Sequence, residues 1–168
     1  MKGAILFLLV AAAAGCSEGT VVEVEPIPAD YTDWYRVDSV GPVPGHGDSY
    51  RIIYANETAR LFGTIIGEGN DQELVYIYPE GSIIVKEVRE RDGDQPGDIN
   101  YVAVMRMLNF NDVPDGADLD EPTDLRSYGW LFTYLADDIN SDEEYRSSCW
   151  DECHAAAPFA GAFYDYGE

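Results

Sequence analysis

Cations are scarce in this sequence. Its 168 residues hold 10 lysines and arginines against 32 aspartates and glutamates, which gives a formal net charge of −22 at pH 7. Such a surplus of negative charge repels the phosphates of nucleic acids and the surfaces of anionic membranes, so we expect no nucleic-acid partner. The same charge would attract a basic soluble redox partner; the alternative is that it only keeps the protein soluble, for example in a salty medium.

The sequence also lacks an apolar run long enough to cross a membrane. The apolar run at residues 4–14 follows Lys2 and ends in small residues, which is typical of a bacterial secretory signal. The residues before and including Cys16, Ala-Ala-Gly-Cys, resemble the site at which a signal peptidase cuts in front of a lipidated cysteine. We therefore predict a lipoprotein signal peptide over 1–15 and a periplasmic protein that is anchored to the membrane by lipid on Cys16. A plain signal peptide without lipidation is the alternative.

Cysteine and histidine are rare, with three and two residues, so their clustering near the end of the chain is informative. Besides Cys16, the cysteines are Cys149 and Cys153, and His154 follows directly. In an oxidising compartment such a pair becomes a disulfide, a metal site or a covalent link to a cofactor. A zinc site would be short of ligands, because the only other histidine, His46, lies about a hundred residues away.

Two interpretations of this cluster remain. A disulfide between Cys149 and Cys153 would be distorted on a helix and would leave His154 without a role. Haem c uses these residue types in this order, because two thiols form thioethers with the haem and the next histidine binds the iron. The spacing here is C-x-x-x-C-H, one residue longer than the usual C-x-x-C-H.

Helical patterns occur at both ends of the chain. Residues 16–28 are acidic and end in proline, which predicts a linker, and 29–40 carry an apolar helical stripe, which predicts a short helix. Residues 41–48, with two prolines and three glycines, predict an irregular loop. A second helix is expected over 142–156, because Ser141 and Glu144 match a capping box.

Strand patterns lie between these helices. The segments rich in β-branched and aromatic residues are 49–55, 73–78, 82–88, 100–108 and 129–135. The second and third segments predict a hairpin, and 109–127 predict an acidic loop. The predicted fold is α+β, mainly β: an antiparallel sheet with an N-terminal helix and a C-terminal haem-binding helix, in one domain over 29–168.

Four segments together resemble the cytochrome P-460 family. They are 45–56, 78–88, 129–135 and 149–167, and the resemblance spans 31–167. It implies a covalently bound haem c held against a mainly antiparallel sheet, often in a homodimer. The family includes enzymes that oxidise hydroxylamine at a lysine-crosslinked haem and the related cytochromes c′-β.

The resemblance assigns roles to four residues. Cys149 and Cys153 would form the thioether links, and His154 would be the axial ligand of the iron. Lys86 would be the catalytic lysine that, in the P-460 enzymes, forms a covalent bond to the porphyrin rim. The residues themselves add that the strand period places Lys86 on an apolar face, where a charge is costly; a lysine on an edge strand that reaches water is the alternative.

Further candidates line the same expected pocket. Arg106 is expected to bind a haem propionate, or else to be a half-exposed arginine of the sheet. Trp130 and Phe132 share a strand face and would wall the pocket or belong to the core. His46 would approach the iron or, as its glycine-rich loop suggests, lie at the surface. The proton acceptor is not assigned, since the acids before the haem motif, Glu143 and Glu144, already suit a helix start.

Three functions are therefore open. The first is a periplasm-facing lipoprotein with haem c that oxidises hydroxylamine, a small nitrogenous substrate, and passes electrons to a soluble redox partner. The second is a protein similar to cytochrome c′-β that binds nitric oxide or carries electrons without a crosslink, with an apolar cap such as Phe62 or Phe110. The third is an acidic lipoprotein without haem and with a Cys149–Cys153 disulfide.

Overall fold

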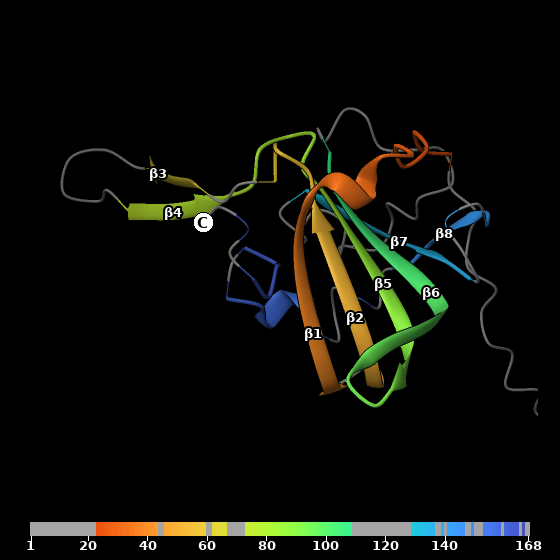
Figure 1. Ribbon diagram of the computed structural model, residues 1–168. Helices are drawn as coiled ribbons and strands as arrows, with labels where there is room; N and C mark the ends of the chain where they lie inside the picture. Colours follow the sequence, from red (N-terminus) through yellow and green to blue (C-terminus); the bar gives the residue numbers. More distant parts are fainter. Residues whose placement is uncertain are drawn as a thin grey trace, which may run out of the picture.

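A six-stranded antiparallel sheet forms the centre of the protein (Figure 1). The residues that the computed structural model describes are 23–43, 46–59, 62–66, 73–108, 129–136, 139, 141–146, 149, 153–158, 160–164 and 166. The predicted signal peptide with Cys16 and the acidic loop at 109–127 lie outside this set. Among the described residues, no helix has the length and apolar character needed to cross a membrane.

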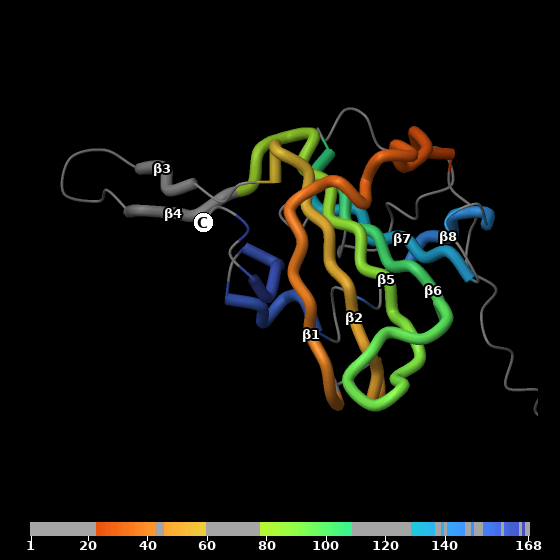
Figure 2. The backbone as a smooth tube through the Cα atoms, viewed as in Figure 1, coloured from red at the N-terminus to blue at the C-terminus, as the bar shows by residue number. Residues whose placement is uncertain are grey.

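The sheet has the strand order β1-β2-β5-β6-β7-β8, and neighbouring strands in it are antiparallel. Its strands are β1 (Tyr35–Val43), β2 (Gly47–Ala55), β5 (Ile83–Asp92), β6 (Gln95–Met107), β7 (Trp130–Leu135) and β8 (Glu143–Tyr145). The strands β3 (Phe62–Ile66) and β4 (Glu73–Ile77) pair with each other between β2 and β5 in the sequence. The chain trace in Figure 2 follows β1, β2, β5 and β6 as they run side by side.

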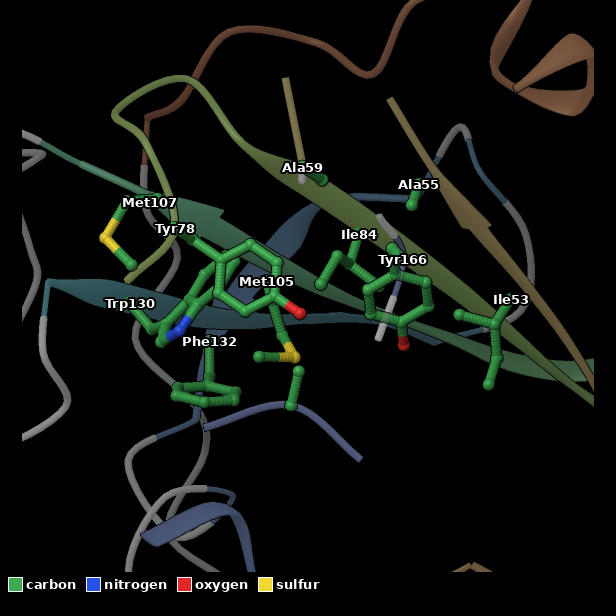
Figure 3. Close-up of a cluster of buried hydrophobic side chains, with 11 residues drawn as sticks. Ile53, Ala55, Ala59, Tyr78, Ile84, Met105, Met107, Trp130, Phe132 and Tyr166 are labelled. Carbon is green, nitrogen blue, oxygen red and sulfur yellow. The ribbon is translucent and has the colours of Figure 1, made fainter. Parts of the chain in front are cut away.

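Alternating side chains give this sheet two different faces. One face carries a core cluster that includes Ile53, Ile84, Met105 and Phe132 (Figure 3). The C-terminal segment, blue in Figure 1, packs against this face through Ala162 and Tyr166. The other face carries a second cluster, whose members on the strands are Tyr50, Ile52, Tyr54, Val85, Val102, Val104 and Leu135. The predicted antiparallel sheet is therefore present.

The predicted N-terminal helix is wrong. Residues 31–33 form a single 3₁₀ turn, η1 (Tyr31–Asp33), and the chain then enters β1. Pairing with β2 along the whole of β1 outweighs the weak helical stripe, because each strand residue gains a cross-strand neighbour. The loop expected at 41–48 is shorter than predicted, since β1 continues through Pro42; a proline is tolerated there because β1 is an edge strand.

The predicted C-terminal haem-binding helix is also wrong. Residues 143–145 form β8, which pairs with β7, and 154–156 form a 3₁₀ turn, η3 (His154–Ala156). Among the described residues, helical backbone is limited to η1, η3 and Cys149. The acids expected at the start of the helix, Glu143 and Glu144, instead pair with Arg106 and Arg146, which explains the error.

The expected hairpin of 73–78 with 82–88 is also wrong. These strands have other partners, because β4 pairs with β3 and β5 pairs with β2 and β6.

A buried ion pair ties β8 to the sheet. Arg106 on β6 and Glu143 on β8 form a salt bridge, and their side chains are 6% and 9% exposed. Arg106 also donates hydrogen bonds to the Thr133 hydroxyl at 3.1 Å and to the Glu25 carbonyl at 3.2 Å. One guanidinium therefore joins three strands and the segment that precedes η1.

Arg106→Leu should destabilise the fold strongly. The substitution leaves the Glu143 carboxylate buried without its cation, which we expect to lower the free energy of unfolding by about 3–5 kcal/mol. Urea unfolding measures the loss. Arg36→Gln is the matched control, because Arg36 pairs with Asp38 at the surface and its loss should cost under about 1 kcal/mol. Equal effects of the two substitutions would contradict the assigned role.

Candidate functional site

A cavity of about 670 Å³ lies between the first face of the sheet and the C-terminal segment. This volume is within the range of about 300–1,000 Å³ that is usual for ligand and cofactor sites. Its apolar wall includes Ile53, Ile84, Met105 and Phe132, which Figure 3 shows on this face of the sheet. Its polar wall includes Lys86, His46, Arg51, Tyr101, Cys149, Cys153 and His154.

The hydrogen bond of His154 defines the state of its ring. Nδ1 lies 2.7 Å from the carbonyl oxygen of Gly161. A carbonyl oxygen only accepts, so Nδ1 carries the proton and Nε2 keeps its lone pair. The ring lies between Phe132 and Phe163, with centroid distances of 4.9 Å and 5.1 Å. Burial, followed by the charge of Lys86, lowers the pKa of His154 to about 4, so this imidazole is neutral at physiological pH.

Cys149 and Cys153 line the same cavity as His154. Both are partly buried, and they are not joined by a disulfide. Cys153 has φ −138° and ψ −54°, so the two cysteines do not stack on one regular helix as the sequence pattern predicts. The three residues that the resemblance assigns to haem are nevertheless brought together at one cavity.

Lys86 reaches the cavity from the middle of the sheet. It lies on β5 and pairs with Ile53 on β2 and Ala103 on β6, so the alternative of an edge-strand lysine does not apply. Nζ of Lys86 lies 2.7 Å from Nε2 of His46. Burial is the main reason that its pKa falls to about 8, well below the usual value of a lysine; Arg51 lowers the pKa further, and the two cysteines act in the opposite direction.

His46 lies in the cavity and not at the surface. Its Nδ1 is 2.5 Å from the hydroxyl oxygen of Tyr101, so the ring is held between Tyr101 and Lys86. Burial, and then the charge of Lys86, lowers the pKa of His46 to about 3, and this ring is therefore also neutral. The glycines on both sides of His46 suggested a surface loop, and no local pattern revealed its partners.

Arg51 and Tyr101 are polar residues of the cavity wall that were not singled out from the sequence. Arg51 is 3% exposed and donates to the Gly41 carbonyl at 2.8 Å and to the hydroxyls of Ser39 and Ser49. The alternation along 49–55, which places Arg51 on the face of Ile53, was a signal that could have found it. Tyr101 was part of a predicted strand, but its role follows only from the hydrogen bond to His46.

Most of the other site candidates from the sequence are not among the described residues of the cavity wall. Arg106 is on the opposite face of the sheet in its ion pair with Glu143, so neither residue is in the cavity wall. Glu144 pairs with Arg146 at 2.7 Å. The described residues that line the cavity include no carboxylate. The remaining candidates for the distal cap, the side chain of Phe62 and the whole of Phe110, lie outside the described part of the chain.

Trp130 and Phe132 share a face of β7, as the strand period predicted. Phe132 lines the cavity, whereas Trp130 belongs to the core cluster beside it and donates from Nε1 to the Ala160 carbonyl at 2.8 Å. The hydrogen bond of Trp130 anchors the C-terminal segment next to His154.

No protein-family model matches this chain, and no curated protein sequence matches it significantly. The likeness to the cytochrome P-460 family therefore stays a prediction that rests on the four segments named above.

Lys86→Met should change how stability depends on pH. The folded pKa of Lys86 is about 8 against 10.5 ordinarily, so between these values the unfolded chain holds more protons, and wild-type stability should rise with pH across this window. The methionine variant lacks this gain and should be the more stable protein at pH 7. Urea unfolding at pH 7, 8, 9 and 10 measures the free energy of unfolding of both proteins. The titration of other groups cancels in the difference between the two values. A difference that does not change with pH would contradict the lowered pKa.

Proposed function

We propose that this chain is a haem c protein of the cytochrome P-460 type, which oxidises hydroxylamine in the cavity beneath the sheet. Cys149 and Cys153 would hold the haem through thioether bonds, and His154 would bind the iron. The observation that carries the proposal is the hydrogen bond from Nδ1 of His154 to the Gly161 carbonyl.

This hydrogen bond is what a metal-binding histidine requires. A histidine that binds a metal nearly always donates its other ring N–H to a carbonyl or carboxylate, which fixes the tautomer and the direction of the ring. In His154 the donor is Nδ1, so Nε2 is available as the ligand. The low pKa of the ring supports the same role, because a proton does not compete with the metal for Nε2 at neutral pH.

The remaining residues of the cavity fit a covalently held haem. Two thiols share the cavity with His154, and an apolar wall with Ile84 and Phe132 suits a flat macrocycle. When bound, the haem would supply the redox chemistry, while the protein supplies orientation and electrostatics. The buried Arg51 offers a cation to an acidic group at the edge of a cofactor, a role that the sequence had suggested for Arg106.

The polar wall favours oxidation of hydroxylamine over mere binding of a gas. Hydroxylamine releases protons as it loses electrons, so a pocket that oxidises it needs proton acceptors. The neutral His46 provides one, and the deprotonated fraction of Lys86, whose pKa of about 8 lets it exchange protons near neutral pH, provides another; Nζ of Lys86 lies 2.7 Å from Nε2 of His46. Binding of nitric oxide releases no proton, so a protein with that role alone would not need this pair.

Three variants test how the haem is held. Wild-type protein from a host with haem-attachment machinery should carry haem that stays bound after denaturation, as absorption and intact mass would show. Cys149→Ser and Cys153→Ser should each lose one thioether, and His154→Ala should keep the covalent haem while its spectrum changes and returns with added imidazole. Arg36→Gln, at the surface, is the control. Wild-type protein without haem would refute the proposal and favour the disulfide.

The same preparations test the reaction. With hydroxylamine and an electron acceptor such as a soluble dye, wild type should turn over, and Lys86→Met should lower kcat more than it raises KM, because the substrate loses a proton acceptor. Haem-loaded protein that binds nitric oxide but shows no turnover with hydroxylamine would favour the gas-binding alternative.

A further inference from the structure

Lys86, His46 and Tyr101 form a hydrogen-bonded chain along the cavity wall. Nζ of Lys86 is 2.7 Å from Nε2 of His46, and Nδ1 of His46 is 2.5 Å from the hydroxyl of Tyr101. Burial raises the pKa of Tyr101 to about 12, so its hydroxyl keeps its proton and can donate or accept. The order of the three groups is that of an activated nucleophile: an attacking atom, a base in contact with it, and a third group that orients the base.

Two of the three groups project from strands and hold the third between them. Lys86 projects from β5 between paired strands, and Tyr101 projects from β6 on the same face of the sheet. The Tyr101 ring also stacks on Tyr134 at a centroid distance of 5.1 Å. The His46 ring is therefore held at both nitrogens by groups on the sheet, although His46 itself precedes β2.

We propose that Lys86 is a nucleophilic amine, that His46 and Tyr101 are its positioning residues, and that in the chain without haem the cavity takes small carbonyl compounds, which condense with Lys86 to an imine. In the neutral amine, one N–H of Lys86 donates to His46, and the nitrogen lone pair is left for the electrophile. Lys2 and Lys86 are the only lysines of the sequence, so the predicted mature chain offers one reactive side-chain amine.

The condensation needs no oxidant or reductant. The lone pair of Nζ forms a bond to the carbonyl carbon, and the π electrons of the carbonyl move to its oxygen. The proton that leaves the nitrogen passes through His46 to the oxygen, which yields a carbinolamine. Loss of the hydroxyl with a proton as water forms the C=N bond, so the products are an imine and water.

This inference does not rest on haem, because the hydrogen bonds involve only side chains of the protein. It also bears on the proposed function: an amine that lines the cavity and loses its proton more readily than an ordinary lysine is what the covalent bond between Lys86 and a porphyrin, implied by the resemblance, would require. The other titratable groups that interact with Lys86 are Arg51, Cys149, Cys153 and His154, and none of them is altered in the test.

The test measures reductive alkylation of the full chain made without haem-attachment machinery. The probe is propanal with cyanoborohydride, which reduces the imine, and the labelled peptide is quantified by mass spectrometry. Lys86 of the folded protein should label at least about tenfold faster at pH 7 than Lys86 of the urea-unfolded chain, because more of the amine is neutral. His46→Gly should lower the rate about tenfold, and free imidazole should restore it.

A tyrosine pair supplies the matched control. Tyr101→Phe should lower the rate severalfold and change its pH profile, whereas Tyr50→Phe, which removes a hydroxyl on the opposite face, should leave both unchanged. Labelling of folded Lys86 at or below the unfolded rate would overturn the inference, as would wild-type rates in both His46→Gly and Tyr101→Phe. Neither result affects haem attachment, so failure here and failure of the proposed function are distinguishable.

Discussion

The pairing register of β5 with its two neighbours is the constraint on which the candidate site depends. Lys86 stands opposite Ile53 on β2 and Ala103 on β6, and all three are among the residues that line the cavity. A slip of one residue would turn Lys86 to the other face, because side chains alternate along a strand. Hydrophobic residues on both faces specify this register, since both core clusters would be broken by the slip.

Burial next to polar partners then sets the chemistry of the cavity. The same desolvation that lowers the pKa of Lys86 also lowers those of His46 and His154, and the charge of Lys86 adds to the effect on both rings. The cavity therefore holds two neutral imidazoles and an amine that titrates near neutrality. Perturbed groups of this kind gather at functional sites more often than at structural ones.

The charged and polar groups on the two faces of the sheet differ in their partners. The opposite face holds charged groups in closed networks, such as Arg106 with Glu143, and Glu87 with Tyr31 and Arg89. These groups satisfy one another and hold β8 and η1 against the sheet. The hydrogen bond of His154 to Gly161 performs a different task on the cavity face, because it leaves one nitrogen of the ring available to a ligand.

Local sequence patterns were sufficient for the central strands and for the residues of the C-terminal cluster. Alternation of β-branched and aromatic residues located β2, β5, β6 and β7, and the spacing of Cys149, Cys153 and His154 by itself marks these residues as candidates for a site. Such features are short-range, so a single segment contains all of their signal.

Only the tertiary structure decided the ends of the sheet and the partners in the cavity. Residues 29–40 and 142–156 carry helical signals, yet pairing with β2 and β7 converts part of each into an edge strand, because long-range contacts outweigh weak local propensity. His46 and Lys86 are forty residues apart, as their numbers in the chain show, and no local pattern links them. The sequence alone determined which residues could do chemistry; the packing of distant strands determined which of them meet, because burial and hydrogen bonding act on the folded chain.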